Sequence, residues 1–188
     1  MRVVAGKFGS RTLRGPRGQA MRPTSDRLRE TLFNILGDAV EDSVFVDAYA
    51  GTGAVGIEAL SRGASRAVFI EKHRAAVALI RKNLSVLGIE ENAEVLPVDA
   101  VKGLAVLAKE GTRADFVFAD PPYADEEEYE RVLEMLGASP LVLPGGHVIF
   151  EHDRRKKLKD RAGNLTRIRR VEQGDAVLSI YERLEREK

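Results

Sequence analysis

A tetrapeptide with the sequence Asp-Pro-Pro-Tyr occupies residues 120–123, directly after a short apolar run. Asp120 and the carbonyl of Pro121 can each accept a hydrogen bond from an exocyclic amine of a nucleic-acid base. Pro121 and Pro122 stiffen the loop, because proline fixes φ and has no N–H. Tyr123 provides a ring on which an unstacked base can lie. The four residues therefore predict a catalytic site for chemistry on a base amine.

A glycine-rich segment at residues 47–56 follows a predicted buried strand. Gly51 and Gly53 permit a tight turn, and the next helix presents free N–H groups to a ligand. The segment also fits G-x-G-x-x-G, with Glu71 twenty residues after Gly51, as in dinucleotide-binding proteins. Asp47 would repel a pyrophosphate, however, and suits a cationic amino acid. The segment therefore favours S-adenosylmethionine, and an NAD-dependent oxidoreductase stays open as an alternative.

An acidic residue ends or directly follows each of four predicted strands, at Asp47, Glu71, Asp99 and Asp120. Open α/β sheets bind ligands at the carboxyl ends of their strands. We expect Glu71 to accept the ribose hydroxyls of the cofactor, and Asp99 either to accept its adenine amino group or to cap the next helix. The predicted cofactor-binding residues are Asp47, Tyr49, Gly51, Thr52, Gly53, Glu71, Lys72, Asp99 and Ala100.

Strand and helix patterns alternate along most of the chain. The predicted strands cover residues 44–47, 67–71, 93–98, 114–119 and 147–151, the last after a turn at 144–146. The predicted helices cover residues 54–62, 73–87, 101–109 and 126–136. This alternation predicts an α/β fold with a mainly parallel sheet that is covered on both faces. A terminal hairpin is expected at residues 166–173 and 176–184, around Gly174 and Asp175.

The segment before this pattern has a different character. Residues 2–5 and 11–14 are predicted to form two short strands around a turn at 6–10. A helix follows, capped by Thr24 or Ser25 and ended by Gly37. We expect a basic hairpin at residues 1–24 and a catalytic domain at residues 25–188.

Composition narrows the possible classes of protein. With 188 residues, the chain is long enough for one domain with a small appendage. The absence of cysteine excludes disulfides, thiolate zinc sites and cysteine nucleophiles, and the three scattered histidines do not have metal-ligand spacing. No apolar run has the length of a membrane span, and the first residues do not resemble a signal peptide. We therefore expect a cytoplasmic protein without a metal or a membrane partner.

Charge is unevenly distributed, although the net charge is only +1. Residues 1–29 and 152–170 each carry a net charge of +7, whereas residues 30–151 carry −11. An acidic middle between basic segments suggests a small-molecule site with polyanion-binding arms. Solvated surface charge is the alternative explanation, and for residues 154–161 an RNA-binding role rests on charge alone.

The sequence motifs together resemble a known family. The resemblance rests on residues 1–7 (MRVVAGK), residues 22–36 (RPTSDRLRETLFNIL), the glycine loop with residues 56–64, and the Asp-Pro-Pro-Tyr tetrapeptide. The chain resembles the bacterial 16S ribosomal RNA guanine-N2 methyltransferases that modify guanine 966, over nearly its whole length. The block at 22–36 is the most specific feature, because DNA adenine-N6 enzymes share the glycine loop and the Asp-Pro-Pro-Tyr tetrapeptide. Ser25 and Tyr49 stand where threonine and phenylalanine are common.

The resemblance implies a Rossmann-like class I methyltransferase with seven strands, the last one antiparallel. It also implies that the cofactor is S-adenosylmethionine, released as S-adenosylhomocysteine, and that an N-terminal hairpin binds RNA. The substrate would be 16S ribosomal RNA in an assembling small subunit, and the enzyme a monomer. The residues expected to contact RNA are Arg2, Lys7, Arg11, Arg14, Arg22, Thr24 and Arg27.

Three other functions remain open at this point. The chain could methylate adenine N6 or the amine of another RNA or DNA base. It could be a dinucleotide-dependent oxidoreductase, or a non-catalytic RNA-binding assembly factor that keeps the fold.

Overall fold

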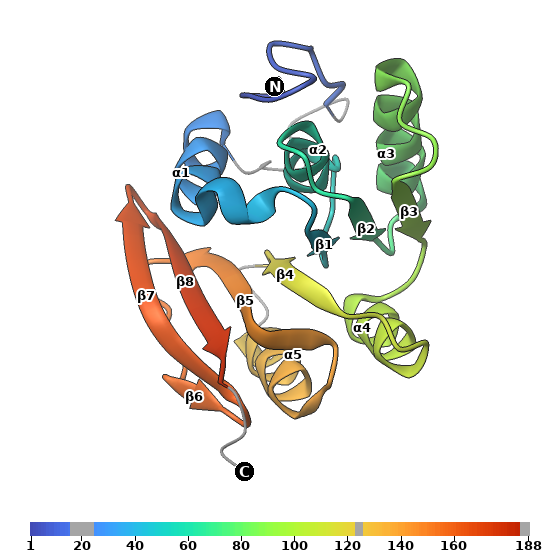
Figure 1. Cartoon of the computed structure of the whole chain (residues 1–188). Coiled ribbons are helices and arrows are strands. Elements are labelled where there is room, and N and C mark those ends of the chain that lie inside the picture. Colours follow the sequence, from blue (N-terminus) through green and yellow to red (C-terminus); the bar gives the residue numbers. More distant parts are fainter. Residues whose placement is uncertain (16–24, 123–125, 185–188) are drawn as a thin grey trace. The chain divides into compact units, whose positions relative to one another are not determined.

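The computed structural model describes residues 1–15, 25–122 and 126–184, and it divides the chain into two compact units (Figure 1). Unit 1 comprises Met1–Asp99 and unit 2 comprises Ala100–Lys188. Each unit contains part of the predicted alternation of strands and helices.

The sheet of unit 1 has three parallel strands in the order β3-β2-β1. They are β1 (Val44–Asp47), β2 (Arg66–Ile70) and β3 (Ala93–Leu96). Their apolar sequences suit strands covered by helices. Strand β3 ends two residues before its predicted limit at 98, since Pro97 follows and has no N–H for the ladder.

Three α-helices lie on one side of these strands, as Figure 1 shows. They are α1 (Asp26–Leu36), followed by the short 3-10 helix η1 (Gly37–Val40), α2 (Ala54–Ser61) and α3 (Arg74–Leu87). Ser25 caps α1, because its hydroxyl accepts a hydrogen bond from the Leu28 amide at 3.1 Å. The alternative cap, Thr24, lies outside the described residues. Gly88 ends α3 in the left-handed conformation, with φ at 67°.

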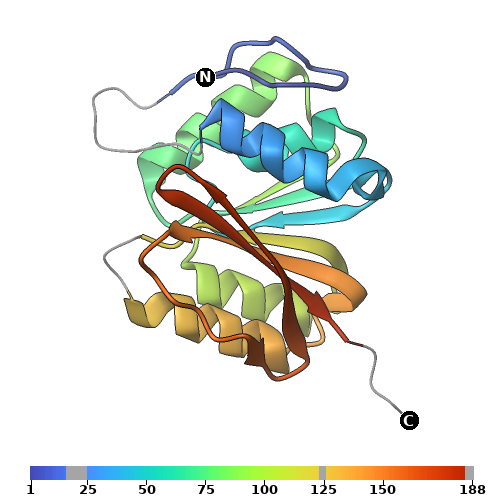
Figure 2. The same cartoon turned by 90° about the vertical axis from the view of Figure 1, so that its left-hand side faces the viewer.

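The N-terminal hairpin packs against the helices of unit 1 (Figure 2). Its two predicted strands are reduced to a single bridge between Arg2 and Thr12. Val3 and Leu13 are buried in the same apolar cluster as Ile57 of α2. The first 15 residues therefore contribute to the core of unit 1.

Unit 2 contains five strands in the order β4-β5-β8-β7-β6. They are β4 (Ala114–Ala119), β5 (Val142–Asp153), β6 (Arg161–Ala162), β7 (Leu165–Gln173) and β8 (Ala176–Arg183). Strand β4 is parallel to β5, and the last strand, β8, is antiparallel to β5 and β7, as expected. The helices are α4 (Ala100–Lys109) and α5 (Glu126–Ala138).

Strand β5 differs from its prediction, because it begins at Val142 and continues through the expected turn at 144–146. The pairing shifts there, from Ala114 opposite Val142 to Phe116 opposite His147. Strand β5 therefore has more residues than β4 between these two pairs, and it accommodates them in a bulge-like irregularity at which Gly145 has a φ of 76°. Strand β6 was not predicted, because two residues show no periodicity. Apart from β6, the described residues contain the seven expected strands.

Candidate functional site

The glycine loop of unit 1 is built by three glycines with different tasks. Gly51 and Gly53 have φ values of 52° and 78°, in the left-handed region that favours glycine. The Gly53 amide donates to the Ala50 carbonyl at 2.6 Å, which closes the turn, and α2 begins at the next residue. A Cβ on Gly56 would lie 2.4 Å from the Phe69 ring, so this glycine lets α2 approach β2 closely.

Asp47 is a buried carboxylate at the end of β1, with 1% of its surface exposed. Its Oδ2 accepts a hydrogen bond from the Gly56 amide at 3.0 Å. No lysine, arginine or histidine of the described residues forms an ion pair with it. Burial, together with the negative charge of Glu71, raises the pKa of Asp47 to about 7. A cationic ligand would relieve this unpaired charge.

Glu71 holds the glycine loop in place. It follows β2 and is nearly fully buried. Its Oε2 accepts from the Gly51 amide at 2.9 Å and its Oε1 from the His73 amide at 2.8 Å. Each carboxylate oxygen keeps a lone pair for a further donor, such as a ribose hydroxyl. Glu71 thus takes part in the start of α3 and can still bind a ligand.

The other predicted cofactor-binding residues differ in their surroundings. Thr52 is buried, and its hydroxyl contacts the Met1 sulfur at 3.6 Å. Tyr49 and Asp99 are half-buried, whereas Lys72 is exposed. Ala100 is buried at the start of α4, in unit 2. Hydrogen bonds within the described part of unit 1 therefore join Asp47 and Glu71 to the glycine loop, whereas Lys72 lies exposed.

Asn83 connects the glycine loop with the N-terminal hairpin, and the sequence did not single it out. It lies on α3 with 2% of its surface exposed. Its Nδ2 donates to the Thr52 carbonyl at 3.0 Å and to the Arg14 carbonyl at 3.2 Å. Its Oδ1 accepts from the Arg14 amide at 2.9 Å. Its position between Ile80 and Leu84, on the apolar face of the helix, could have indicated a buried polar residue that needs hydrogen-bond partners.

The hairpin is held by buried polar groups of α1 and α2. Both carboxylate oxygens of Glu58 accept from it, at 2.7 Å from the Val4 amide and 3.0 Å from the Ala5 amide. The fully buried Arg29 donates to the Arg2 carbonyl. Gly6 has a φ of 79°, and a Cβ there would lie 1.9 Å from a backbone oxygen of Ser61. The hairpin backbone is therefore fixed on the helices.

The basic residues predicted to contact RNA do not use their side chains in the hydrogen bonds described above that hold the hairpin on the helices. The exposed residues among them are Arg2, Lys7, Arg11, Arg14 and Arg27. Arg22 and Thr24 lie outside the described residues. The described part thus presents five basic side chains on or next to a rigid hairpin.

The Asp-Pro-Pro-Tyr segment begins where β4 ends, in unit 2. Asp120 is half-buried, Pro121 is buried and Pro122 is exposed, whereas Tyr123 lies outside the described residues. The Pro121 carbonyl accepts a hydrogen bond from the Tyr129 hydroxyl at 2.8 Å. Tyr129 was not predicted from the sequence, although a tyrosine buried on a helix needs a partner for its hydroxyl.

Several cations of the second basic segment, residues 152–170, pair with carboxylates that lie outside it. Arg154 pairs with Asp175 at 4.0 Å, Lys159 pairs with Glu134 at 2.9 Å, and Arg170 pairs with Glu172. Lys157, Arg161 and Arg169 are exposed, and none of the described acidic groups pairs with them. Net charge alone therefore overstates how many cations this segment offers to a polyanion.

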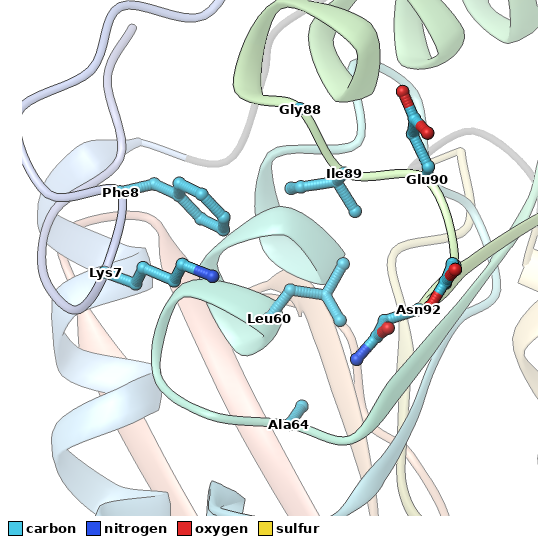
Figure 3. A pocket seen from close by; sticks show the side chains of 9 residues that line it. Lys7, Phe8, Leu60, Ala64, Gly88, Ile89, Glu90 and Asn92 are labelled. Atoms are coloured by element: carbon cyan, nitrogen blue, oxygen red, sulfur yellow. The ribbon is translucent and has the colours of Figure 1, made fainter.

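A pocket of about 310 Å³ lies in unit 1 (Figure 3). It lies at the C-terminal end of α2, whereas the glycine loop precedes its N-terminal end. The residues that line it include Lys7, Phe8, Leu60, Ile89 and Asn92. None of the predicted cofactor-binding residues lines this pocket, so we do not assign it to the cofactor.

Two further structural properties bear on the type of protein. None of the helices within the described residues is long and apolar enough to cross a membrane. The same residues contain no group of three or more His, Asp or Glu side chains that could hold a metal ion.

Comparison with known proteins identifies relatives over nearly the whole chain. The model of a family described as "Conserved hypothetical protein 95" matches residues 1–182. "Putative rRNA methyltransferase YlbH" of Bacillus subtilis is 32% identical over 183 residues, which are 97% of this chain and 99% of that protein. "Ribosomal RNA small subunit methyltransferase D" of Escherichia coli is 42% identical over 123 residues, which are 65% of this chain and 60% of that protein.

A solved structure shows the same fold. "Putative methyltransferase yhhF" from Escherichia coli matches with a TM-score of 0.86 and 34% sequence identity, over 98% of both chains. The arrangement is the Rossmann-like fold of class I methyltransferases, as the resemblance implied. The chain therefore belongs to the family of the small-subunit ribosomal RNA methyltransferases of type D.

Proposed function

We propose that the protein transfers a methyl group from S-adenosylmethionine to the exocyclic N2 amine of guanine 966 in 16S ribosomal RNA. The observation that carries the cofactor assignment is the buried Asp47 carboxylate, which lies beside the glycine loop without a cationic partner among the described residues. Family membership and the block at residues 22–36 support ribosomal RNA and the guanine as substrate. We expect the enzyme to act as a monomer on an assembling small subunit.

The residues of unit 1 suit S-adenosylmethionine. Asp47 would bind the ammonium group of its methionine part, Glu71 the ribose hydroxyls, and Asp99 the adenine amino group. When bound, the cofactor supplies a methyl group that is already activated on a sulfonium sulfur. A dinucleotide fits less well, because its pyrophosphate would lie next to the carboxylate of Asp47.

Asp120 and Pro121 would act on the guanine. The lone pair of the guanine N2 is delocalised into the ring. Hydrogen-bond acceptors for the two N–H groups of this amine can orient it so that the lone pair points at the methyl group. Asp120 would accept one N–H. The Pro121 carbonyl would accept the second N–H, because the Tyr129 hydroxyl occupies only one of the two lone pairs of that carbonyl oxygen. The charged N2 then loses a proton, for which Asp120 is the nearest proposed acceptor, and Tyr123 would stack on the base.

Calorimetry and rRNA mapping test the proposal together. We expect S-adenosylhomocysteine to bind the protein and NAD not to bind. We also expect small-subunit particles from a strain without this methylase to gain one methyl group at guanine 966, located by mass spectrometry of rRNA fragments. A tight NAD complex would refute the cofactor assignment. A methyl group on adenine N6, or on another RNA, would refute the substrate assignment.

RNA binding by the hairpin can be tested without removing it. Deleting residues 1–20 would uncover the core around Val3 and Leu13, so substitutions are the better test. Replacing Lys7, Arg11 and Arg14 by glutamine should weaken RNA binding and reduce the salt dependence, by a slope of roughly 0.7–0.9 for each lost phosphate contact. Filter binding at several salt concentrations measures both quantities.

A matched control changes the same amount of charge elsewhere. Arg154, Arg155 and Lys159 are exposed cations that already have acidic partners in unit 2. Replacing these three by glutamine should leave the salt slope almost unchanged. If both triple variants lost RNA affinity equally, the hairpin would have no special role in binding RNA.

A further inference from the structure

The hydroxyl of Tyr129 is directed at the loop that carries the proposed catalytic residues. Tyr129 lies on α5 and is fully buried. Its Oη is 2.8 Å from the Pro121 carbonyl oxygen and 3.3 Å from the Glu151 carbonyl oxygen. A phenol has one proton to donate, and the shorter contact to Pro121 is the better hydrogen bond.

The surroundings of Tyr129 keep its ring in one place. The ring packs near Phe150, with centroids 6.2 Å apart, and meets the edge of His152 at 6.5 Å. The ammonium group of Lys156 lies 4.1 Å from the ring centroid, at a distance suited to a cation–π interaction. Because these contacts hold the ring, the position of the hydroxyl is set by the core and does not depend on the conformation of the loop.

The two prolines of the loop offer few groups for hydrogen bonds. Pro121 and Pro122 have no N–H, so this part of the backbone can form hydrogen bonds only through its carbonyl groups. The carbonyl that Tyr129 holds lies between the two proline rings, one residue after Asp120. The hydrogen bond therefore restrains the backbone two residues after the end of β4 at Ala119.

We infer that Tyr129 is a positioning residue for methyl transfer, holding the Pro121 carbonyl and thereby the Asp120 carboxylate in the reactive arrangement. The inference rests on the proposed function, since it assigns a task in that reaction. Tyr129 itself touches neither substrate nor cofactor in this role; it acts through the loop.

Replacing Tyr129 by phenylalanine tests the inference, because the ring stays and only the hydroxyl is lost. We expect the single-turnover rate of methyl transfer to fall about 10- to 100-fold, the range for a small misplacement of reacting groups. The affinity for S-adenosylhomocysteine and the KM for S-adenosylmethionine should not change. Hydrogen exchange at the amides of Phe118, Ala119 and Asp120 should become faster.

Tyr181 provides a matched control within unit 2. It is also fully buried, it packs edge-on against Phe150 at 5.9 Å, and its hydroxyl donates to the Lys159 carbonyl at 2.7 Å. Burial raises the pKa of Tyr181 to about 12. Replacing Tyr181 by phenylalanine removes a similar hydrogen bond at a distance from the loop. The methyl-transfer rate and the exchange near Asp120 should therefore remain those of the wild type.

The outcomes separate the inference from the proposed function. If the wild-type protein methylates no rRNA, the proposed function fails, and hydrogen exchange still decides whether Tyr129 holds the loop. A wild-type rate in Tyr129→Phe, or an equal loss in both variants, would overturn the inference. So would unchanged exchange near Asp120 in Tyr129→Phe.

Discussion

Replacing Asp120 by alanine is expected to lower the single-turnover rate of methyl transfer at least about 10²-fold, the loss typical of one preorganised electrostatic group. Asp120 follows β4 directly and precedes the held Pro121 carbonyl. In the proposed reaction it accepts a hydrogen bond from the guanine amine as the new bond forms. Its loss should therefore appear in turnover, while the affinity for S-adenosylhomocysteine stays unchanged.

Two further variants sharpen the Asp120 experiment. Asp120→Asn keeps an oxygen acceptor but loses the charge, so its rate should lie between those of the wild type and the alanine variant. Asp115→Asn changes a half-buried carboxylate near the start of β4. It should methylate at the wild-type rate. Near-normal turnover of Asp120→Ala would show that the reaction does not take place at this loop.

Replacing Asp47 by asparagine is expected to abolish most cofactor binding and at the same time to stabilise the cofactor-free protein. The pKa of this carboxyl is about 7 in the folded protein, against an ordinary value of 3.8. Between these two pH values the folded state holds a proton that the unfolded state has lost. Stability therefore falls as the pH rises from about 4 to about 7, and above pH 7 the whole cost remains, on the order of 4 kcal/mol.

Asparagine removes this cost but keeps an oxygen that can accept from the Gly56 amide. Denaturant unfolding should show Asp47→Asn to be more stable than the wild type at pH 8 and similar to it near pH 4. Calorimetry should show weak or no binding of S-adenosylhomocysteine. In the wild type, a bound ammonium group favours the ionised carboxylate, so affinity should decrease as the pH falls below about 7.

Glu58 is the control for Asp47, because its buried carboxylate is already satisfied by the hairpin amides and by Arg62 at 2.9 Å. Glu58→Gln should destabilise the protein, since it leaves the buried Arg29, 3.9 Å from Glu58, and the partly buried Arg62 with a neutral partner. If Asp47→Asn were also destabilised at pH 8, the Asp47 carboxylate would not carry the unpaired charge that we assign to it. Retained cofactor affinity in Asp47→Asn would contradict its proposed role as a ligand of the ammonium group.

The sequence alone was sufficient where short-range chemistry decides the structure. Strands β1 and β4 have the predicted bounds, and Ser25, one of the two predicted caps, caps α1. The glycine loop was recognised because two positions need left-handed φ values that glycine adopts readily. The catalytic role of the Asp-Pro-Pro-Tyr segment stays a prediction, made because its four residue types offer acceptors, stiffness and a ring for stacking.

The tertiary structure decided which polar groups meet across the chain. Glu58 binds the amide of Val4 across 54 positions of sequence, and Asn83 binds Arg14 across 69. Tyr129 is only eight residues from Pro121, yet nothing in that spacing indicates that a helix will turn the hydroxyl toward the loop. Sequence periodicity reports which face of an element is buried, but a partner on another element depends on how the chain packs. For the same reason the net charge of residues 152–170 did not reveal that Lys159 pairs with Glu134 and Arg154 with Asp175, since both carboxylates lie outside the segment and are brought near by the fold.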